Sequence, residues 1–249
     1  MSKRKAENEA KLSEVDIIDA IEVSGDIEIV RQCLEHGVDA NVRKPFIEVG
    51  LLELALSNEQ WEIASVLISN GADPNYHSEW GNNISPLEYC VRDKKMNLVA
   101  QLVSNGVDIN KKFSNDESPL FEIVKACDVD SKGDFITSEQ ISLFKSLIEK
   151  GASVPDAFDK DQTVLHVIMD MINDEGLDIL KVFVEKGADI TVQNQYNQTV
   201  IDMAESYKLE TIAQYLRSLG NDEADDLDGS LPHDLQIAYA QAWIFIARC

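Results

Sequence analysis

The chain has 249 residues, of which 44% are hydrophobic and 27% charged, so it can bury a sizeable core and has ordinary globular composition. Its net charge of −23 repels nucleic acid and anionic membranes and speeds encounter with basic partners, although the same charge would also serve solubility alone. Nucleic acid is therefore not an expected partner.

Residues 1–11 form a polar arm that lacks the apolar core of a signal peptide. No run approaches the roughly 18 apolar residues that a membrane span requires. The four cysteines are far apart and form no CxxC pair, and three of them lie in apolar helical patterns, where a reduced cysteine acts as a small hydrophobe. These features predict a reducing, cytoplasmic compartment. The chain is expected to be a monomer.

A repeated ending organises the chain from residue 12 to residue 220. Segments such as "LEHGVDAN", "ISNGADPN" and "VSNGVDIN" each close an apolar helical pattern with a glycine, the residue that most readily adopts the left-handed backbone of a helix C-terminus. The spacings between these glycines are 34, 35, 45, 36 and 33 residues, so the period is near 34 with one long unit. The glycines are Gly37, Gly71, Gly106, Gly151, Gly187 and Gly220.

A second helix start lies upstream of most of these glycines. Examples are "SPLEYC" (85–90), "SPLFEI" (118–123), "TVLHVI" (163–168) and "TVIDMA" (199–204). Ser or Thr caps the first turn, and proline, where present, stands just inside it. Each unit is therefore predicted to be a turn, a short helix, a second helix and a terminating glycine.

These residues resemble the ankyrin repeat, whose hallmarks are a T-P-L-H-x-A start and a G-A-D-x-N ending. The resemblance covers roughly 12–220 as about six repeats, although the first two units lack the Thr-Pro start. It implies an all-α solenoid of helix–turn–helix units with projecting loops, called fingers, and a concave side that binds other proteins.

The fourth unit is about eleven residues too long, with its insertion near 124–138. The insertion resembles a calcium-binding EF-hand loop, because Asp128, Asp130 and Glu139 match the first, third and twelfth ligand positions. Against calcium, Lys132 takes the fifth position, where an oxygen ligand is needed. The preferred interpretation is an acidic, exposed insertion, with Ser138 capping the helix that follows.

No catalytic motif is present: the sequence contains no GxSxG elbow, phosphate-binding glycine loop, HExxH pair or CxxC. The resemblance gives His166, which occupies the family's histidine position, a structural role. We therefore expect no enzyme activity and no cofactor.

Partner contacts are expected on the fingers and at the exposed ends of the first helices, because buried aromatic residues often anchor interfaces. Trp80 ranks first, since its finger is about two residues longer than its neighbours. The other finger candidates are Phe46, Tyr76, Phe113 and Phe158, and the resemblance adds Arg92, Asp93, Lys125, Asp170 and Tyr207 on the concave side.

The end of the chain is predicted to be an acidic linker (221–229) followed by an amphipathic helix (230–249). A solenoid exposes apolar surface at its last unit, so the helix is expected to fold back as a cap. Contact with a partner or a membrane surface is the alternative.

The leading functional hypothesis is an interaction scaffold that binds a basic protein partner through its concave face. A sharper form is an inhibitor that masks a basic functional site, such as a toxin's substrate cleft or a nuclear-import segment. The alternatives are a toxin-neutralising immunity protein, a secreted effector directed at a host, and a calcium-responsive regulator.

Overall fold

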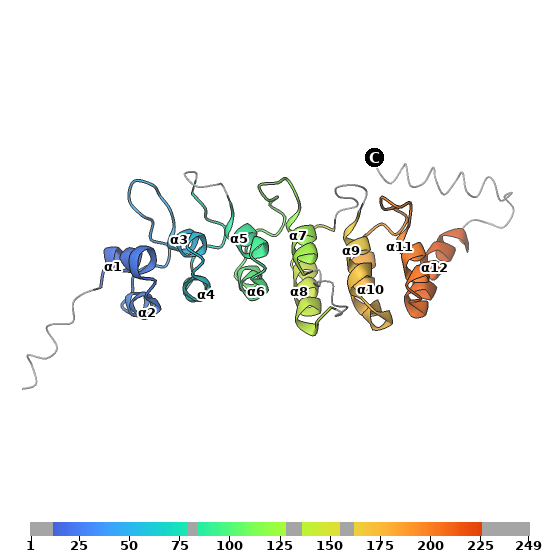
Figure 1. Cartoon of the computed structure of the whole chain (residues 1–249), viewed down its shortest axis with the longest axis horizontal. Coiled ribbons are helices and arrows are strands. Elements are labelled where there is room, and N and C mark those ends of the chain that lie inside the picture. Colours follow the sequence, from blue (N-terminus) through green and yellow to red (C-terminus); the bar gives the residue numbers. More distant parts are fainter. Residues whose placement is uncertain (1–11, 79–83, 128–135, 155–161, 226–249) are drawn as a thin grey trace, which may run out of the picture. The chain divides into compact units, whose positions relative to one another are not determined.

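The computed structural model describes residues 12–78, 84–127, 136–154 and 162–225, and within these residues the chain is helical except for one isolated β-bridge (Figure 1). The helices follow one another in pairs, and a finger leads from each pair to the next. This arrangement confirms the predicted all-α class. The elements are α1 (Glu14–Asp19), η1 (Ala20–Ser24), α2 (Ile27–Glu35), α3 (Leu51–Ser57), α4 (Trp61–Ser69), α5 (Pro86–Arg92), α6 (Met96–Ser104), α7 (Pro119–Ala126), α8 (Ser138–Glu149), α9 (Val164–Met171), η3 (Asp174–Gly176), α10 (Leu177–Glu185), α11 (Val200–Ser206) and α12 (Glu210–Asp225).

Side-chain caps set where the first helices begin. The hydroxyl groups of Ser85 and Ser118 accept hydrogen bonds from the backbone three residues on, each at 3.2 Å, and a proline follows each serine. The second helices of five pairs end at glycines whose φ lies between 83° and 89°. The predicted left-handed glycine ends are therefore present at Gly37, Gly71, Gly106, Gly151 and Gly187.

Two helix boundaries differ from the sequence-based expectation. The N-cap of α8 is Thr137 and not Ser138, because Thr137 Oγ1 accepts from Gln140 N at 3.2 Å and Gln140 Oε1 accepts from Thr137 N at 2.8 Å. Helix α12 continues past Gly220 to Asp225, into the segment expected to be a linker. No proline stands between Gly220 and Asp225 to stop it.

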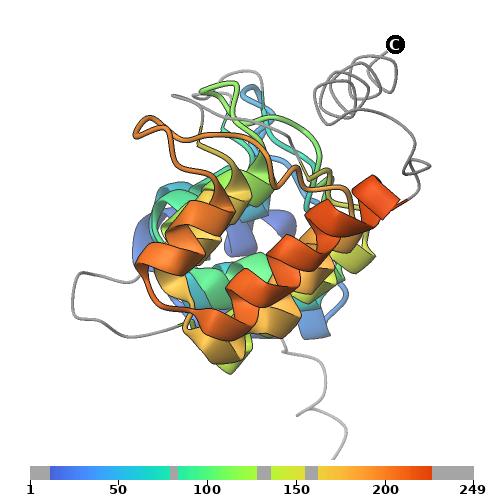
Figure 2. The same cartoon turned by 90° about the vertical axis from the view of Figure 1, so that its right-hand side faces the viewer.

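The chain divides into two compact units, which are described separately. Unit 1 comprises residues 1–128 and 137–153, and unit 2 comprises residues 129–136 and 154–249. Within unit 1, first helices pack on first helices (α3 on α5, α5 on α7) and second helices on second helices (α2 on α4, α4 on α6, α6 on α8). The fingers of unit 1, blue to green in Figure 2, leave the same end of these pairs. The core lies between the two rows of helices and includes the fully buried side chains of Ile17, Leu51, Leu67, Leu102, Ile123 and Phe144.

One asparagine in each of the first three repeats joins that repeat to the next. Asn41 Nδ2 donates to Gly71 O at 3.0 Å, and Asn41 Oδ1 accepts from Asp73 N at 2.7 Å. Asn75 makes the same pair of bonds to Gly106 O (3.1 Å) and Asp108 N (2.7 Å). We call this series of bonds the asparagine ladder. It fixes the position of each finger relative to its neighbour, because both ends of one amide side chain are used.

Asn110 makes the third pair of ladder bonds in unit 1, to Gly151 O at 3.0 Å and Ser153 N at 2.8 Å. The next repeat ending reads "GASVP", so Pro155 stands where an asparagine would continue the ladder. A proline side chain has no hydrogen-bonding group, and the following ending places Thr191 at the same position.

Unit 2 is held by contacts of a different kind. Helix α11 packs on α9 and α12, and α10 packs on α9. Asp174 Oδ1 accepts from Thr211 N at 2.9 Å and from Ile212 N at 3.2 Å, so a side chain of η3 caps the start of α12. These hydrogen bonds, with that from the Thr211 hydroxyl as the largest cause, lower the pKa of Asp174.

Replacing a ladder asparagine tests how much this series of bonds contributes to unit 1. Asn75→Ala removes two hydrogen bonds to the next repeat and should lower the free energy of unfolding by about 1–2 kcal/mol, measured by urea denaturation. Asn97→Ala on α6 is the matched control, because Asn97 is exposed within a helix. The free energy of unfolding of this variant should be unchanged or slightly higher, since alanine favours a helix more than asparagine does. Equal stability of the two variants would show that the ladder contributes little.

Candidate protein-binding surface

A buried glutamate in each of two first helices holds the finger of the next repeat. Glu53 is 7% exposed, and its carboxylate accepts from Ser78 N at 2.7 Å and from Ser78 Oγ at 2.8 Å. Glu88 is 4% exposed and accepts from Ser114 N at 2.9 Å and from the Ser114 hydroxyl. A buried carboxylate is tolerated when donors satisfy it, so each Glu–Ser pair requires its finger to remain in place.

Sequence reasoning missed these glutamates, because a glutamate in the first turn of a helix is typical of an exposed N-terminal residue. The signal that could have identified them is their place in the repeat. Glu53, Glu88 and His166 all stand three residues after the N-cap of a first helix, at the position that the family resemblance assigns to histidine. A serine follows each glutamate 25 or 26 residues later.

His166 links two fingers of unit 2 in the equivalent way. Its side chain is 0% exposed, its Nδ1 accepts from Thr163 N at 3.1 Å, and its Nε2 lies 3.2 Å from Gln198 O. Nδ1 is therefore the unprotonated nitrogen, and Nε2–H donates to the carbonyl. Burial lowers the pKa of this imidazole by disfavouring its charged form. The neutral ring thus has the structural role that was predicted.

The first finger is a short hairpin that carries Phe46 at its tip. Arg43 and Gly50 form an antiparallel bridge, Lys44 N donates to Val49 O at 2.8 Å, and Glu48 N donates to Lys44 O at 3.0 Å. Phe46 is 95% exposed and has a φ of 72°. Left-handed backbone costs a residue with a side chain about 1–2 kcal/mol, so this loop holds a strained and fully exposed aromatic residue.

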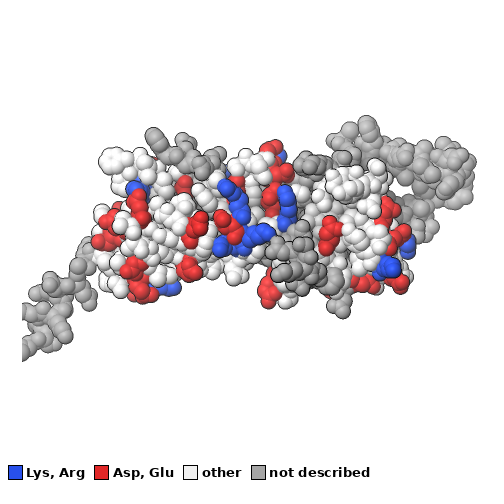
Figure 3. Space-filling view, viewed as in Figure 1, with Lys and Arg blue, Asp and Glu red and all other residues white. Residues whose placement is uncertain are grey.

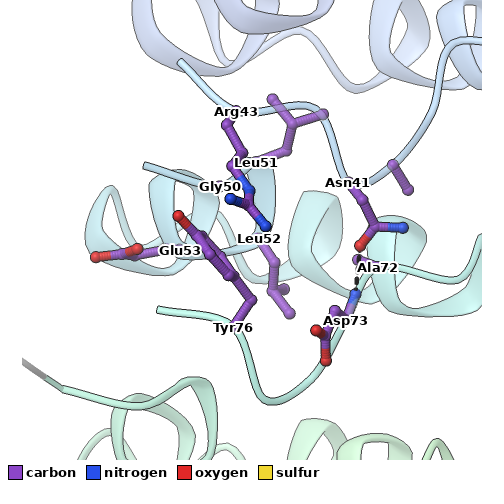
Figure 4. Close-up of a pocket in the computed structure, with 10 residues that line it drawn as sticks. Asn41, Arg43, Gly50, Leu51, Leu52, Glu53, Ala72, Asp73 and Tyr76 are labelled. Atoms are coloured by element: carbon purple, nitrogen blue, oxygen red, sulfur yellow. Dashed lines mark hydrogen bonds between the residues drawn. The ribbon is translucent and has the colours of Figure 1, made fainter. Parts of the chain in front are cut away.

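Tyr76 of the second finger packs against the first. The Arg43 guanidinium lies 4.1 Å from the centre of the Tyr76 ring, and the Tyr76 hydroxyl donates to Glu48 O. Gly50 allows this approach, since a Cβ there would lie 3.0 Å from Tyr76 Cδ1. Tyr76, Arg43 and Glu53 line a half-open pocket of about 280 Å³ with Asn41 and Asp73 (Figure 4).

The other finger candidates have different surroundings. Phe113 is 7% exposed, so its ring is buried, and its backbone N donates to Glu117 O at 3.0 Å within the third finger. Trp80 and Phe158 lie outside the described residues. Of the predicted finger contacts in the described part of the chain, only Phe46 is fully exposed.

The candidates at the ends of the first helices are exposed in both units. Arg92 and Asp93 end α5 in solvent, and Lys125 near the end of α7 lies 3.5 Å from Glu122. In unit 2, Tyr207 Oη donates to Asp170 Oδ1 at 2.7 Å. This bond and the burial of the phenol raise the pKa of Tyr207 to about 12. Asp170 and Tyr207 thus engage each other, whereas Arg92 and Asp93 are open to a partner.

Charge is distributed unevenly along unit 1. Residues 12–91 contain 15 Asp and Glu but 3 Lys and Arg, which is a net charge of −12. Residues 92–125 contain 6 Lys and Arg against 5 Asp and Glu, which is a net charge of +1. On the face drawn in Figure 3, basic side chains gather at the level of α5 to α7. The acidic surplus of unit 1 therefore belongs to its first repeats, which include the first finger.

The cysteine side chains of unit 1, Cys33, Cys90 and Cys127, are buried. Burial raises the pKa of the Cys90 and Cys127 thiols, to about 12 and about 11, so neither is a ready nucleophile.

Of the calcium candidates, Asp128 and Asp130 lie outside the described residues. Glu139 lies in the first turn of α8, where backbone and hydroxyl hydrogen bonds lower the pKa of its carboxyl group. Within residues 12–78, 84–127, 136–154 and 162–225 no cluster of three or more metal-binding side chains occurs, and no helix there is both long and apolar enough to cross a membrane.

Comparisons with known proteins agree with this geometry. Residues 17–126 match the family model described as ankyrin repeats, in three copies. An ankyrin repeat domain from Acinetobacter baumannii AYE superposes with a TM-score of 0.55 at 17% identity, covering 84% of this chain and 99% of that one. The ankyrin repeat protein EF0377 superposes with a TM-score of 0.52 at 21% identity, covering 83% of this chain and 98% of that one. Comparison with curated sequences gives no significant match.

The paired helices and repeated fingers define a helical repeat protein. Residues 17–126 match ankyrin repeats, and the solved ankyrin-repeat structures share the fold of the chain. Its class is thus a protein–protein interaction scaffold, and the family is generally non-catalytic. The number of repeats, about six, stays a prediction from the sequence.

Removing a buried glutamate tests whether the Glu–Ser pairs hold the fingers. Glu53→Ala leaves the Ser78 N–H and hydroxyl without their acceptor and should lower the free energy of unfolding by about 2–3 kcal/mol in urea denaturation. Glu62→Ala, on the exposed side of α4, removes the same charge and should change stability by less than about 0.5 kcal/mol. A similar small loss in both variants would contradict the role given to Glu53.

The buried histidine makes a separate prediction about pH. The pKa of His166 is lower in the folded chain than in the unfolded chain. As the pH falls below about 6.5, the unfolded chain therefore binds a proton at His166, whereas the folded chain does not. The free energy of unfolding should therefore decrease from about pH 8 to pH 5.5. In His166→Gln the dependence should be shallower, whatever the variant's stability at pH 8. Identical slopes for the two proteins would contradict the buried neutral ring.

Proposed function

We propose that this protein binds a basic protein partner through the fingers and first helices of unit 1, and that the acidic first repeats direct the encounter. The observation that carries the proposal is the division of charge, −12 in residues 12–91 against +1 in residues 92–125. An acidic region of this kind attracts a basic surface over about one Debye length, roughly 10 Å at moderate salt. This attraction mainly raises the association rate of the complex.

The short-range part of the proposed site is built from exposed residues of the fingers and first helices. The asparagine ladder and the two buried glutamates engage one edge of each finger, so the fingers present their other side chains in a fixed arrangement. Arg92, Asp93 and Lys125 border this surface, and we place them among the contacts. A preorganised surface loses little conformational entropy on binding, which favours affinity for one defined shape.

A dedicated partner would favour the inhibitor form of the proposal, in which binding masks a basic functional site on that partner. Capture of one basic toxin would identify an immunity role, and capture of a nuclear-import segment would identify an inhibitor of transport. Capture of many unrelated proteins would favour an adaptor. These finer roles follow from the partner and not from the fold.

The test begins with affinity capture by the tagged full-length chain from its native lysate at low salt, followed by mass spectrometry. Affinity of the purified partner should fall steeply as salt rises from about 0.05 to 0.5 M. The triple variant Glu14→Gln/Glu35→Gln/Glu62→Gln should slow association several-fold. The control Asp178→Asn/Glu185→Gln/Glu210→Gln removes the same charge from unit 2 and should have a smaller effect.

Three results would contradict the proposal. The first is that the wild-type chain retains no protein that an empty control column does not also retain. The second is an affinity that does not change with salt, and the third is equal association rates for the two triple variants.

A further inference from the structure

Phe46 combines two properties that are each unfavourable without a partner. It is the most exposed of the large hydrophobic residues in the described chain, at 95%, and the next are Val23 at 80% and Tyr196 at 70%. Its backbone is also left-handed, with a φ of 72°, a conformation that suits glycine better than phenylalanine. A loop free to relax would turn this side chain toward the protein or change its backbone.

The first finger is braced from both sides against such relaxation. Lys44 Nζ forms an ion pair with Glu22 of η1, on the side of the preceding helices. On the other side, the Tyr76 hydroxyl donates to Glu48 O, and Arg43 stacks on the Tyr76 ring. The hairpin bonds from Lys44 N to Val49 O and from Glu48 N to Lys44 O close the loop between these braces.

Packing within the protein does not explain the phenylalanine. The pocket beneath the finger is lined by Tyr76, Leu51, Leu52 and their neighbours, and Phe46 is not part of its lining. The third finger shows the alternative, because there the aromatic Phe113 is buried at 7% exposure. The first finger thus holds its aromatic side chain away from the core that it could have joined.

We propose that Phe46 is an anchor that enters an apolar pocket on the partner protein. The proposal rests on the proposed function and deepens it by naming the kind of surface that the partner presents. The charged side chains of the finger are paired, Arg43 with Glu48 at 3.8 Å and Lys44 with Glu22, so the surface that receives Phe46 is an apolar pocket. The net charge of −12 over residues 12–91 calls for basic residues on the partner around that pocket.

Such an anchor would bind tightly for its size because the braces fix it in advance. Burial fixes only two side-chain torsions of an aromatic residue, so the loss of conformational entropy is small. The ring also displaces water from the pocket that it fills. A rigid loop also avoids the ordering cost that a flexible finger would meet on binding.

The substitution Phe46→Gly separates an anchor from a structural residue. Glycine accepts the left-handed backbone better than phenylalanine does, so the melting temperature should stay the same or rise. Capture of the partner from native lysate by the full-length variant, quantified by mass spectrometry against wild type, should fall about tenfold or more. Tyr196→Ala, which removes an exposed finger aromatic of unit 2, is the matched control and should capture as wild type does.

A photoreactive benzoylphenylalanine incorporated at position 46 gives an independent readout in the same lysate. The cross-linked peptide of the partner should line an apolar pocket with basic residues nearby, and the analogue at position 196 should give no such product.

The outcomes distinguish this inference from the proposed function. If wild type and Phe46→Gly capture the same partner equally, Phe46 is not an anchor, and the scaffold function stands. If Phe46→Gly unfolds more easily than wild type, the ring has a structural role and the inference fails. If the wild-type chain captures no protein, both proposals fail together.

Discussion

One amide side chain in each of the first three repeats places each finger of unit 1 relative to the next. Asn41, Asn75 and Asn110 use both their donor and their acceptor on the backbone of the following repeat. The buried carboxylates of Glu53 and Glu88 add a second connection at the level of the first helices. Hydrophobic packing is not directional, so by itself it does not fix the position of one repeat relative to the next. The hydrogen bonds of the asparagine ladder and of the Glu–Ser pairs are directional and fix that position at two places.

The sequence predicted the features that depend on local chemistry. The glycine helix ends and the caps at Ser85 and Ser118 are determined within a few residues, and the structure contains them. Features that depend on the neighbouring repeat were not predictable in this way. A glutamate at position 53 is interpreted as exposed until Ser78 is known to lie beside it, and no local pattern separates the buried Phe113 from the exposed Phe46.

Helix boundaries show the same limit. Thr137 and Ser138 are both good caps, and only the position of the Gln140 side chain determines which residue begins α8. Gly220 matches five earlier glycines in its spacing, yet it lies within α12. A helix ends at glycine when the chain must turn into a following finger, and no further repeat ending follows Gly220 in the sequence.

The asparagine ladder has a consequence for how unit 1 responds to ligands. In a linear array, stability is the sum of each repeat's own stability and the coupling between neighbours. The side-chain bonds of Asn41, Asn75 and Asn110 add to the coupling between successive repeats of unit 1. A ligand that binds one repeat stabilises that repeat by mass action. Part of that free energy is shared with the neighbouring repeats through these bonds, so a ligand on one finger raises the thermal stability of the other repeats of unit 1.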